Sequence, residues 1–195
     1  MALTKLNNKA VANVTSIPVA LGDMVLVSSA TASSSASIEF SLGNYKEYKF
    51  FFVNMHPQND NVAFQFNLST DGGSNYNVVK TTTYFNSYHT ENDADAGLQY
   101  QSANDLAQST SYQQIQKEQG NDNDQSVSGT LTLFNPSTTY VKHFLIRVNG
   151  MQHNDYLQDT FVAGYGNTTS AVNAISFQMS SGNIDAGKIL MFGIN

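Results

Sequence analysis

Alternation of apolar and polar residues with a period of two runs through much of this sequence. Apolar residues occupy every second position in the segments 38–42, 62–68, 144–148 and 175–179. Successive side chains of a β-strand point to opposite faces of the sheet, so this period predicts half-buried strands. No segment of useful length has an apolar period of 3.6 residues, which an amphipathic helix would require. The alternation therefore predicts an all-β protein.

Turn-forming residues separate these runs and set the expected number of strands. Asp71-Gly72-Gly73, Asn135-Pro136-Ser137 and Ser181-Gly182-Asn183 each follow an apolar run, and such residues favour tight turns. Many short antiparallel strands indicate a sandwich or a barrel. We expect one β-sandwich domain over residues 21–195, preceded by a candidate N-terminal arm at 1–20. It should contain eight to ten strands, near 24–28, 37–42, 47–56, 61–69, 76–84, 126–135, 139–149, 173–180 and 187–194.

Residues 86–125 break the pattern, because they are rich in Asn, Asp, Gln, Ser and Tyr and contain few aliphatic side chains. Composition of this kind predicts a long polar loop. Ordered polar loops on a β-core often carry function or contact another subunit. We therefore expect this excursion to form an interface or a protruding loop, with an incidental loop as the alternative.

Charge and composition exclude several classes of protein. The chain has 9 Lys and Arg against 15 Asp and Glu, a net charge of −6, and Arg147 is its one arginine. This distribution gives no basic footprint for nucleic acid or for an anionic membrane surface. No apolar run approaches the length of a membrane span, and no apolar secretion signal is recognisable at the start. Cysteine is absent, so disulfides and thiolate chemistry are excluded.

The sequence offers no catalytic, cofactor or metal site. The histidines His56, His89, His143 and His153 form no His-x-His pair, although zinc catalysis needs three clustered ligands. The segment 121–124 (NDND) lacks the Gly and Glu that follow at fixed spacing in a helix-loop-helix calcium site. An irregular calcium loop is the alternative to a solvated acidic turn there. Glycoside hydrolysis needs a pair of carboxylates, and only four glutamates are present.

Tyrosine is the remaining candidate for recognition chemistry. Three tyrosines of the polar excursion, Tyr88, Tyr100 and Tyr112, are the expected interface residues. Tyr76, Tyr84, Tyr156 and Tyr165 also lie at or near predicted loops. Exposed aromatic rings beside Asn, Gln and Asp suit either stacking on sugars or a hydrated protein–protein interface. Packing in the core or on a strand surface is the simpler explanation for a good share of them.

Three stretches of the chain carry recognisable motifs. The first runs from Tyr45 to Pro57 and continues through FQFNLSTDGG at 64–73. The second is SGTLTLFNP at 128–136, and the third is AISFQMSSGNIDAGKILMFGI at 174–194. Taken together, and in this order, they resemble small virion structural proteins of tailed bacteriophages. The resemblance covers about residues 40–84 and 126–195, with the excursion divergent, and the third stretch is its most specific part.

This resemblance implies a β-sandwich of jelly-roll type and a non-enzymatic role in the particle. The expected protein is a capsid-decoration (cement) subunit that stabilises the head, often assembled as a homotrimer. Its partners would be capsid or tail proteins of the same virion, and it would be made in the host cytoplasm. A tail-fibre or receptor-binding module that recognises host surface glycan is the alternative, and a small glycan hydrolase is a third hypothesis. The family offers no catalytic residues to transfer.

Overall fold

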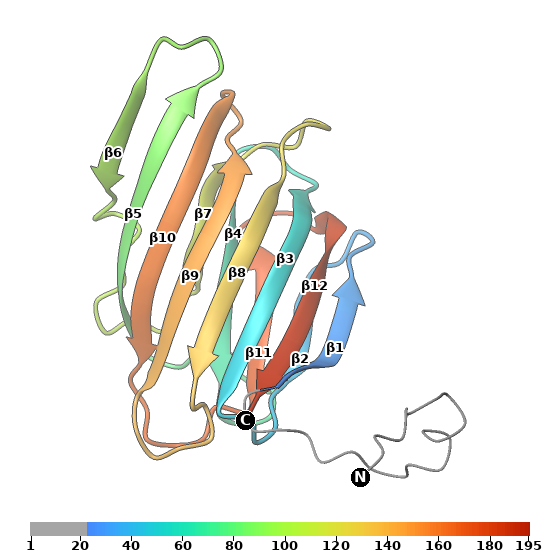
Figure 1. The fold of residues 1–195 in the computed structure, drawn as a ribbon, viewed down its shortest axis with the longest axis vertical. Coiled ribbons are helices and arrows are strands. Elements are labelled where there is room, and N and C mark those ends of the chain that lie inside the picture. The colour runs from blue at the N-terminus through green and yellow to red at the C-terminus, as the bar shows by residue number, and fades with distance from the viewer. Residues whose placement is uncertain (1–22) are drawn as a thin grey trace, which may run out of the picture.

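The computed structural model describes residues 23–195 as β-strands joined by turns and loops, without a helix in that range (Figure 1). The candidate arm at 1–20 lies outside the described residues. The twelve strands are β1 (Met24–Thr31), β2 (Ile38–Ser41), β3 (Glu47–Pro57), β4 (Val62–Ser69), β5 (Lys80–Thr90), β6 (Ala96–Tyr100), β7 (Gln113–Gln119), β8 (Val127–Phe134), β9 (Lys142–Met151), β10 (Tyr156–Gly166), β11 (Ala174–Met179) and β12 (Ile184–Ile194).

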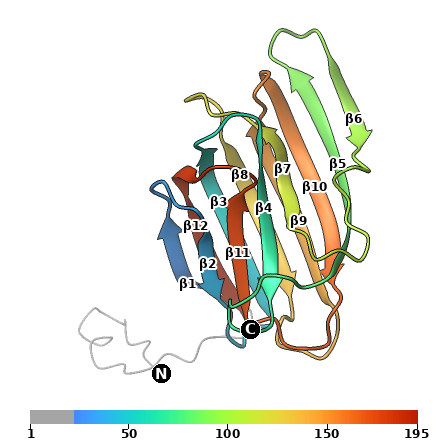
Figure 2. The ribbon, with the colours of Figure 1, turned by 180° about the vertical axis from the view of Figure 1, so that it is seen from behind.

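The strands form two sheets that pack face to face, so the expected antiparallel β-sandwich is confirmed. The larger sheet has eight strands in the order β1-β12-β3-β8-β9-β10-β5-β6, and the smaller has four in the order β2-β11-β4-β7. Seen from behind, the smaller sheet covers only part of the larger one, and the β5–β6 hairpin extends beyond it (Figure 2). We call the face of the larger sheet that is turned away from the smaller sheet the outer face.

Eight of the strands pair in a nested order. Strand β1 pairs with β12, β2 with β11, β3 with β8 and β4 with β7, all antiparallel. The other four strands are inserted between β4 and β7 and between β8 and β11, and they extend the larger sheet beyond β8. The insertions therefore make the two sheets unequal in width.

Aromatic side chains fill the space where the two sheets overlap. Phe177 of β11 lies at the centre of this cluster, with its ring centroid 5.3 Å from those of both Phe50 and Phe52 on β3. Phe64 and Phe66 of β4 lie at 6.1 and 6.4 Å from the same ring. All five side chains are buried. These residues stand at the alternating apolar positions, which is why the period of two locates the core.

The excursion at 86–125 is not the long polar loop that its composition suggests. All nine expected strands are present, and three more occur at 96–100, 113–119 and 156–166. The first two lie inside the excursion, which also contains the end of β5. For β7 the prediction fails because buried positions of the strand carry amides, Gln113, Gln116 and Gln119, which are fully buried. β6 has no buried position that could produce an apolar alternation. Amides that are buried through mutual hydrogen bonds leave no apolar alternation in the sequence.

The segment between β6 and β7 is held against β5 by backbone hydrogen bonds. The Gln101 N–H donates to Tyr84 O at 2.9 Å, the Thr82 N–H to Leu106 O at 2.9 Å, and the Lys80 N–H to Ser109 O at 2.8 Å. The chain thus crosses from the edge of the larger sheet to the edge of the smaller one. This crossing aligns β7 along the inner side of β5 and β10 and forms one wall of the groove described next.

Candidate functional site

A groove runs along the line where the edge of the smaller sheet meets the wider sheet. Three hollows of about 580, 150 and 390 Å³ lie in series, the second and third along this line and the first at one end of it. The first, at the tips of the β5–β6 and β9–β10 hairpins, shares Asp95 and Tyr156 with the second. The second shares Lys117 with the third, which reaches Asn104 and Gln114. We call these three hollows together the seam groove.

Two tyrosines form an aromatic wall at the middle hollow. Tyr88 on β5 and Tyr156 on β10 are half-buried, and their ring centroids lie 5.8 Å apart at an interplanar angle of 52°. The Tyr88 hydroxyl donates to the Asp95 carboxylate at 3.3 Å. Partial desolvation, and then the charge of Asp95, raises the pKa of Tyr88, so its hydroxyl stays protonated at neutral pH.

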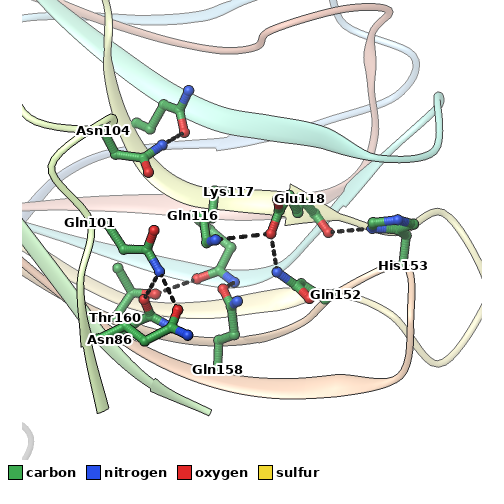
Figure 3. A network of polar contacts seen from close by, with 12 residues as sticks. Asn86, Gln101, Asn104, Gln116, Lys117, Glu118, Gln152, His153, Gln158 and Thr160 are labelled. Carbon is green, nitrogen blue, oxygen red and sulfur yellow. Dashed lines mark hydrogen bonds and ion pairs between the residues drawn. The ribbon is translucent and has the colours of Figure 1, made fainter. Parts of the chain in front are cut away.

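Below this wall, a network of amide and hydroxyl groups connects β7 with β10 (Figure 3). Gln116 Nε2 donates to Gln158 Oε1 at 2.8 Å, and Thr160 Oγ1 donates to Gln116 Oε1 at 2.8 Å. All three side chains are at most 3% exposed. Gln158 also lines the middle hollow, and its oxygen is occupied by Gln116. The network therefore fixes the orientation of the Gln158 amide at the floor of the groove.

A β-bulge on β7 supplies the charged pair of the groove. The register between β4 and β7 shifts between Val62 and Phe64, opposite Lys117 and Glu118, and Glu118 has a φ of 53°. Left-handed backbone of this kind is costly for a residue other than glycine and is concentrated at functional positions. Lys117 Nζ lies 3.0 Å from Glu118 Oε2, and Gln152 Nε2 donates to the same carboxylate oxygen.

The outer face carries a second candidate surface, which is apolar. One row of paired positions runs from Arg147 on β9 through Phe161 on β10 and Phe85 on β5 to Tyr100 on β6. The Phe85 and Phe161 rings stack with their centroids 4.9 Å apart and an interplanar angle of 2°. Leu98 is 74% exposed, Tyr100 62% and Leu145 55%. A shallow hollow of about 330 Å³ lies between Leu145 and the stacked rings.

Arg147 organises the centre of this apolar surface. Its guanidinium carbon lies 4.8 Å from the Phe161 ring centroid, and its Nη2 and Nε donate to Asp159 at 2.8 and 3.2 Å. The hydrogen bond and charge of Asp159 raise the pKa of Arg147 above its ordinary value. The one arginine of the chain is thereby held over an aromatic ring, an arrangement common in protein interfaces.

The structure separates the three expected interface tyrosines. Tyr88 faces the seam groove, Tyr100 lies on the outer face, where its hydroxyl donates to Asp105, and Tyr112 is half-buried just before β7. They do not form one site. Tyr84, which we expected near a loop, is fully buried within β5, and this burial raises its pKa to about 12.

The sequence pattern overlooked the polar residues of the groove. Lys117, Glu118, Gln152 and Gln158 were not among the expected site residues, although the run QQIQKEQ at 113–119 is unusually rich in glutamine. Such a run indicates either a solvated strand or an amide network. Only the pairing of β7 with β4, and its contact with β10, distinguishes the two.

Comparisons with known proteins do not identify a family for this chain. No protein-family model matches the chain, and no curated protein is significantly similar to it in sequence. Within residues 23–195, no group of three or more His, Asp and Glu side chains could hold a metal ion. The same residues include no helix with the length and apolar character that a membrane span needs. The candidate sites are the seam groove and the outer face.

Proposed function

We propose that this chain is a non-enzymatic structural subunit of a tailed-bacteriophage virion, a capsid-decoration protein that docks on the particle through its outer face. The observation that carries the proposal is the apolar surface around the stacked rings of Phe85 and Phe161, with Arg147 over Phe161. Large exposed apolar patches on soluble proteins mark interaction surfaces. The occupant we propose is a protein surface of the same particle.

The composition of the outer face favours a protein partner. Aromatic residues and arginine are enriched at the centres of protein interfaces, where they contribute most of the binding energy. Here Phe85, Phe161, Tyr100 and Arg147 lie in one cross-strand row, and Leu145 stands beside it. The neighbouring strand β8 contributes the smaller side chains Thr130 and Thr132 to the same hollow. Such a mixture of large and small side chains on a rigid sheet provides a surface with both projections and recesses.

The nested strand pairing supports the kind of fold that the resemblance implies. We propose that the eight strands of the nested set form a jelly roll, with β5, β6, β9 and β10 as insertions. A jelly roll contains eight strands in two sheets, and viral capsid proteins use it widely. The insertions widen one sheet of this core, and the apolar patch lies mainly on the inserted strands. The proposed docking surface is therefore an addition to the basic fold.

Rebinding to particles provides the test of this function. The chain should be present in purified particles at about one copy per capsid subunit, or one trimer per few subunits, as measured by quantitative mass spectrometry. A Leu145→Asp variant should rebind to stripped particles at least about tenfold more weakly, because a charge would be buried at the interface. Leu145 is 55% exposed, so the free energy of unfolding should fall by no more than about 1 kcal/mol.

Ser137→Asp is the matched control, because it adds the same charge at an exposed turn between β8 and β9. It should rebind like the unaltered protein. A copy number far below that of the capsid protein would favour a tail or fibre location instead of decoration. Absence from the particle, or unchanged rebinding of Leu145→Asp, would overturn the proposal.

A further inference from the structure

We infer that the seam groove is a binding site for an extended glycan built of uncharged sugars. The inference does not depend on docking through the outer face, because the groove lies on the opposite side of the larger sheet. It rests on the shape, the lining and the charge of the groove.

The shape of the groove suits a chain molecule. The three hollows follow one another along the seam and share lining residues at each junction. The two larger hollows have volumes in the range typical of ligand sites, and the middle one, about 150 Å³, is a constriction between them. A compact ligand would occupy one hollow, whereas a linear polymer can occupy all three.

The lining of the constriction matches the two kinds of surface on a sugar ring. A pyranose presents a weakly polar face of C–H groups and a rim of hydroxyl groups. Tyr88 and Tyr156 provide aromatic faces for the first. Gln99, Gln152 and Gln158 also line the hollow. The oxygens of Gln99 and Gln158 already accept from Gln101 and Gln116, and Gln152 Nε2 donates to Glu118. An amide oxygen has a second lone pair and an amide nitrogen a second hydrogen, and these can bond to the hydroxyl groups.

The floor of the constriction is ordered before any ligand arrives. Gln158 is 3% exposed and is oriented by Gln116, which is itself held by Thr160. Within residues 23–195, no hydrogen bond uses the Nε2 of Gln158. This donor lies in a residue that lines the hollow, so it is available to a ligand hydroxyl. A donor that is already fixed loses little conformational entropy on binding.

The charge of the groove selects against anionic polymers. Glu91, Asp95 and Asp155 line the tip hollow, and Glu118 lines the hollow at the other end. Lys117 is the one cation in the lining of these three hollows, and it is paired with Glu118 at 3.0 Å. Phosphorylated or carboxylated glycans would meet a net negative surface on a chain of net charge −6. Uncharged sugars avoid this repulsion.

The bulge at Lys117 and Glu118 also has a simpler role, since bulges and lysines protect edge strands from unwanted pairing. That role explains the left-handed Glu118 on β7. It does not explain the fixed orientation of Gln158 at the floor of the groove or the pair of half-buried tyrosines on the opposite wall. We attribute these two features to ligand binding.

Binding to a defined panel of glycans tests the inference. The probes are hexasaccharides of glucose in α-1,4, β-1,4 and β-1,3 linkage and of N-acetylglucosamine, with an oligogalacturonate as the anionic comparison. We expect at least one neutral probe to bind the full chain and the oligogalacturonate to bind at least tenfold more weakly. Tyr156→Ala should weaken binding of the neutral probe at least tenfold. Tyr140→Ala, which removes a ring that is 78% exposed and lines none of the three hollows, should leave binding unchanged.

NMR on the unaltered protein provides a second readout that needs no variant to fold. The side-chain amide resonances of Gln152 and Gln158 should shift on titration with the bound hexasaccharide, while the backbone amides of Leu145 and Phe161 should not. Failure of every neutral probe to bind, or preference for the anionic probe, would overturn the inference. Resonance shifts confined to residues of the outer face would also overturn the inference. Since particle rebinding is measured separately, either proposal can fail while the other stands.

Discussion

Around Phe177 the two sheets meet through aromatic rings, whereas around Gln116 they meet through amide and hydroxyl groups. Both regions are buried to a similar degree. Aromatic packing depends little on the relative orientation of the side chains, because most of its contribution to stability comes from the apolar area removed from water. The amide network is stable only if each buried donor meets an acceptor. The first region therefore holds the sheets together, and the second determines how β7 aligns with β10.

In the polar region, some buried polar atoms also lack a hydrogen-bond partner. Asn86 Nδ2 and Gln119 Oε1 are buried without a hydrogen-bond partner among the described residues. Lys80 is fully buried on the inner side of β5 and donates to Val78 O at 2.8 Å and to Asn67 Oδ1. The comparison thus predicts that the aromatic region contributes more stability, and that the polar region makes stability depend on pH and on matched partners.

The largest expected effect comes from emptying the aromatic core. Phe177→Ala should reduce the free energy of unfolding by about 3–5 kcal/mol, because it removes a ring that contacts both sheets and leaves a cavity. Urea unfolding followed by circular dichroism measures the change. Leu98→Ala is the control. Leu98 is 74% exposed on β6, so this substitution should lower the free energy of unfolding by less than about 0.5 kcal/mol. Similar losses in the two variants would contradict the assignment of the core.

A smaller effect should appear as a dependence of stability on pH. Burial lowers the pKa of Lys80 to about 7, while the unfolded chain has the ordinary value near 10.5. Between these two values the unfolded state binds a proton that the folded state does not, so stability rises with pH across this window. The rise between pH 7 and pH 9 should be about 2 kcal/mol.

Lys80→Met should remove this rise, because it leaves no titrating group at the position. Asn67 Oδ1 would still accept the Leu68 N–H at 2.9 Å, so the neighbouring amide keeps a partner. Unfolding curves recorded in urea at pH 7, 8 and 9 compare the two proteins. An equal pH dependence in both would show that Lys80 is not the group responsible.

The smallest effect concerns a single link of the amide network. Gln116→Leu should reduce stability by about 1–2 kcal/mol, because the Thr160 hydroxyl and the Gln158 carbonyl oxygen would be buried without partners. Adding Thr160→Val should recover part of this loss, since one unpaired group is then removed. Thermal unfolding of the single and double variants measures the coupling between the two sites. Strictly additive losses would contradict a hydrogen-bonded network at this position.

The same contrast explains how much of the fold could be predicted from the sequence. The strands β2, β4, β9 and β11 were located because Phe40, Phe66, Ile146 and Phe177 stand at alternating positions. β10 was overlooked because, apart from the buried Val162, its inward positions 158, 160, 164 and 166 are Gln, Thr, Gly and Gly. β7 was overlooked because three of its buried positions are glutamines. A residue of this kind is recognisable as buried only when its partner is known.

The candidate site was predictable to a smaller extent. Tyr88 was expected at an interface and does line the seam groove, although Tyr100 and Tyr112 lie elsewhere. Gln158 and its partner Gln116 are 42 residues apart, and their spacing follows no local motif. The left-handed backbone of Glu118 depends on the shift of register against β4. Both features are consequences of tertiary pairing, which a local sequence pattern does not encode.

The nested pairing of strands has a consequence for how the protein folds. β12 lies between β1 and β3 in the larger sheet. The sheet therefore cannot be completed until β12 has been synthesised. Until then β1 lacks its neighbour and β3 has one free edge, and unpaired edges invite association with other chains. Pairing between segments this far apart in sequence also slows folding. Refolding from urea should therefore be slow and sensitive to protein concentration, with the joining of β1 to β12 among the last steps.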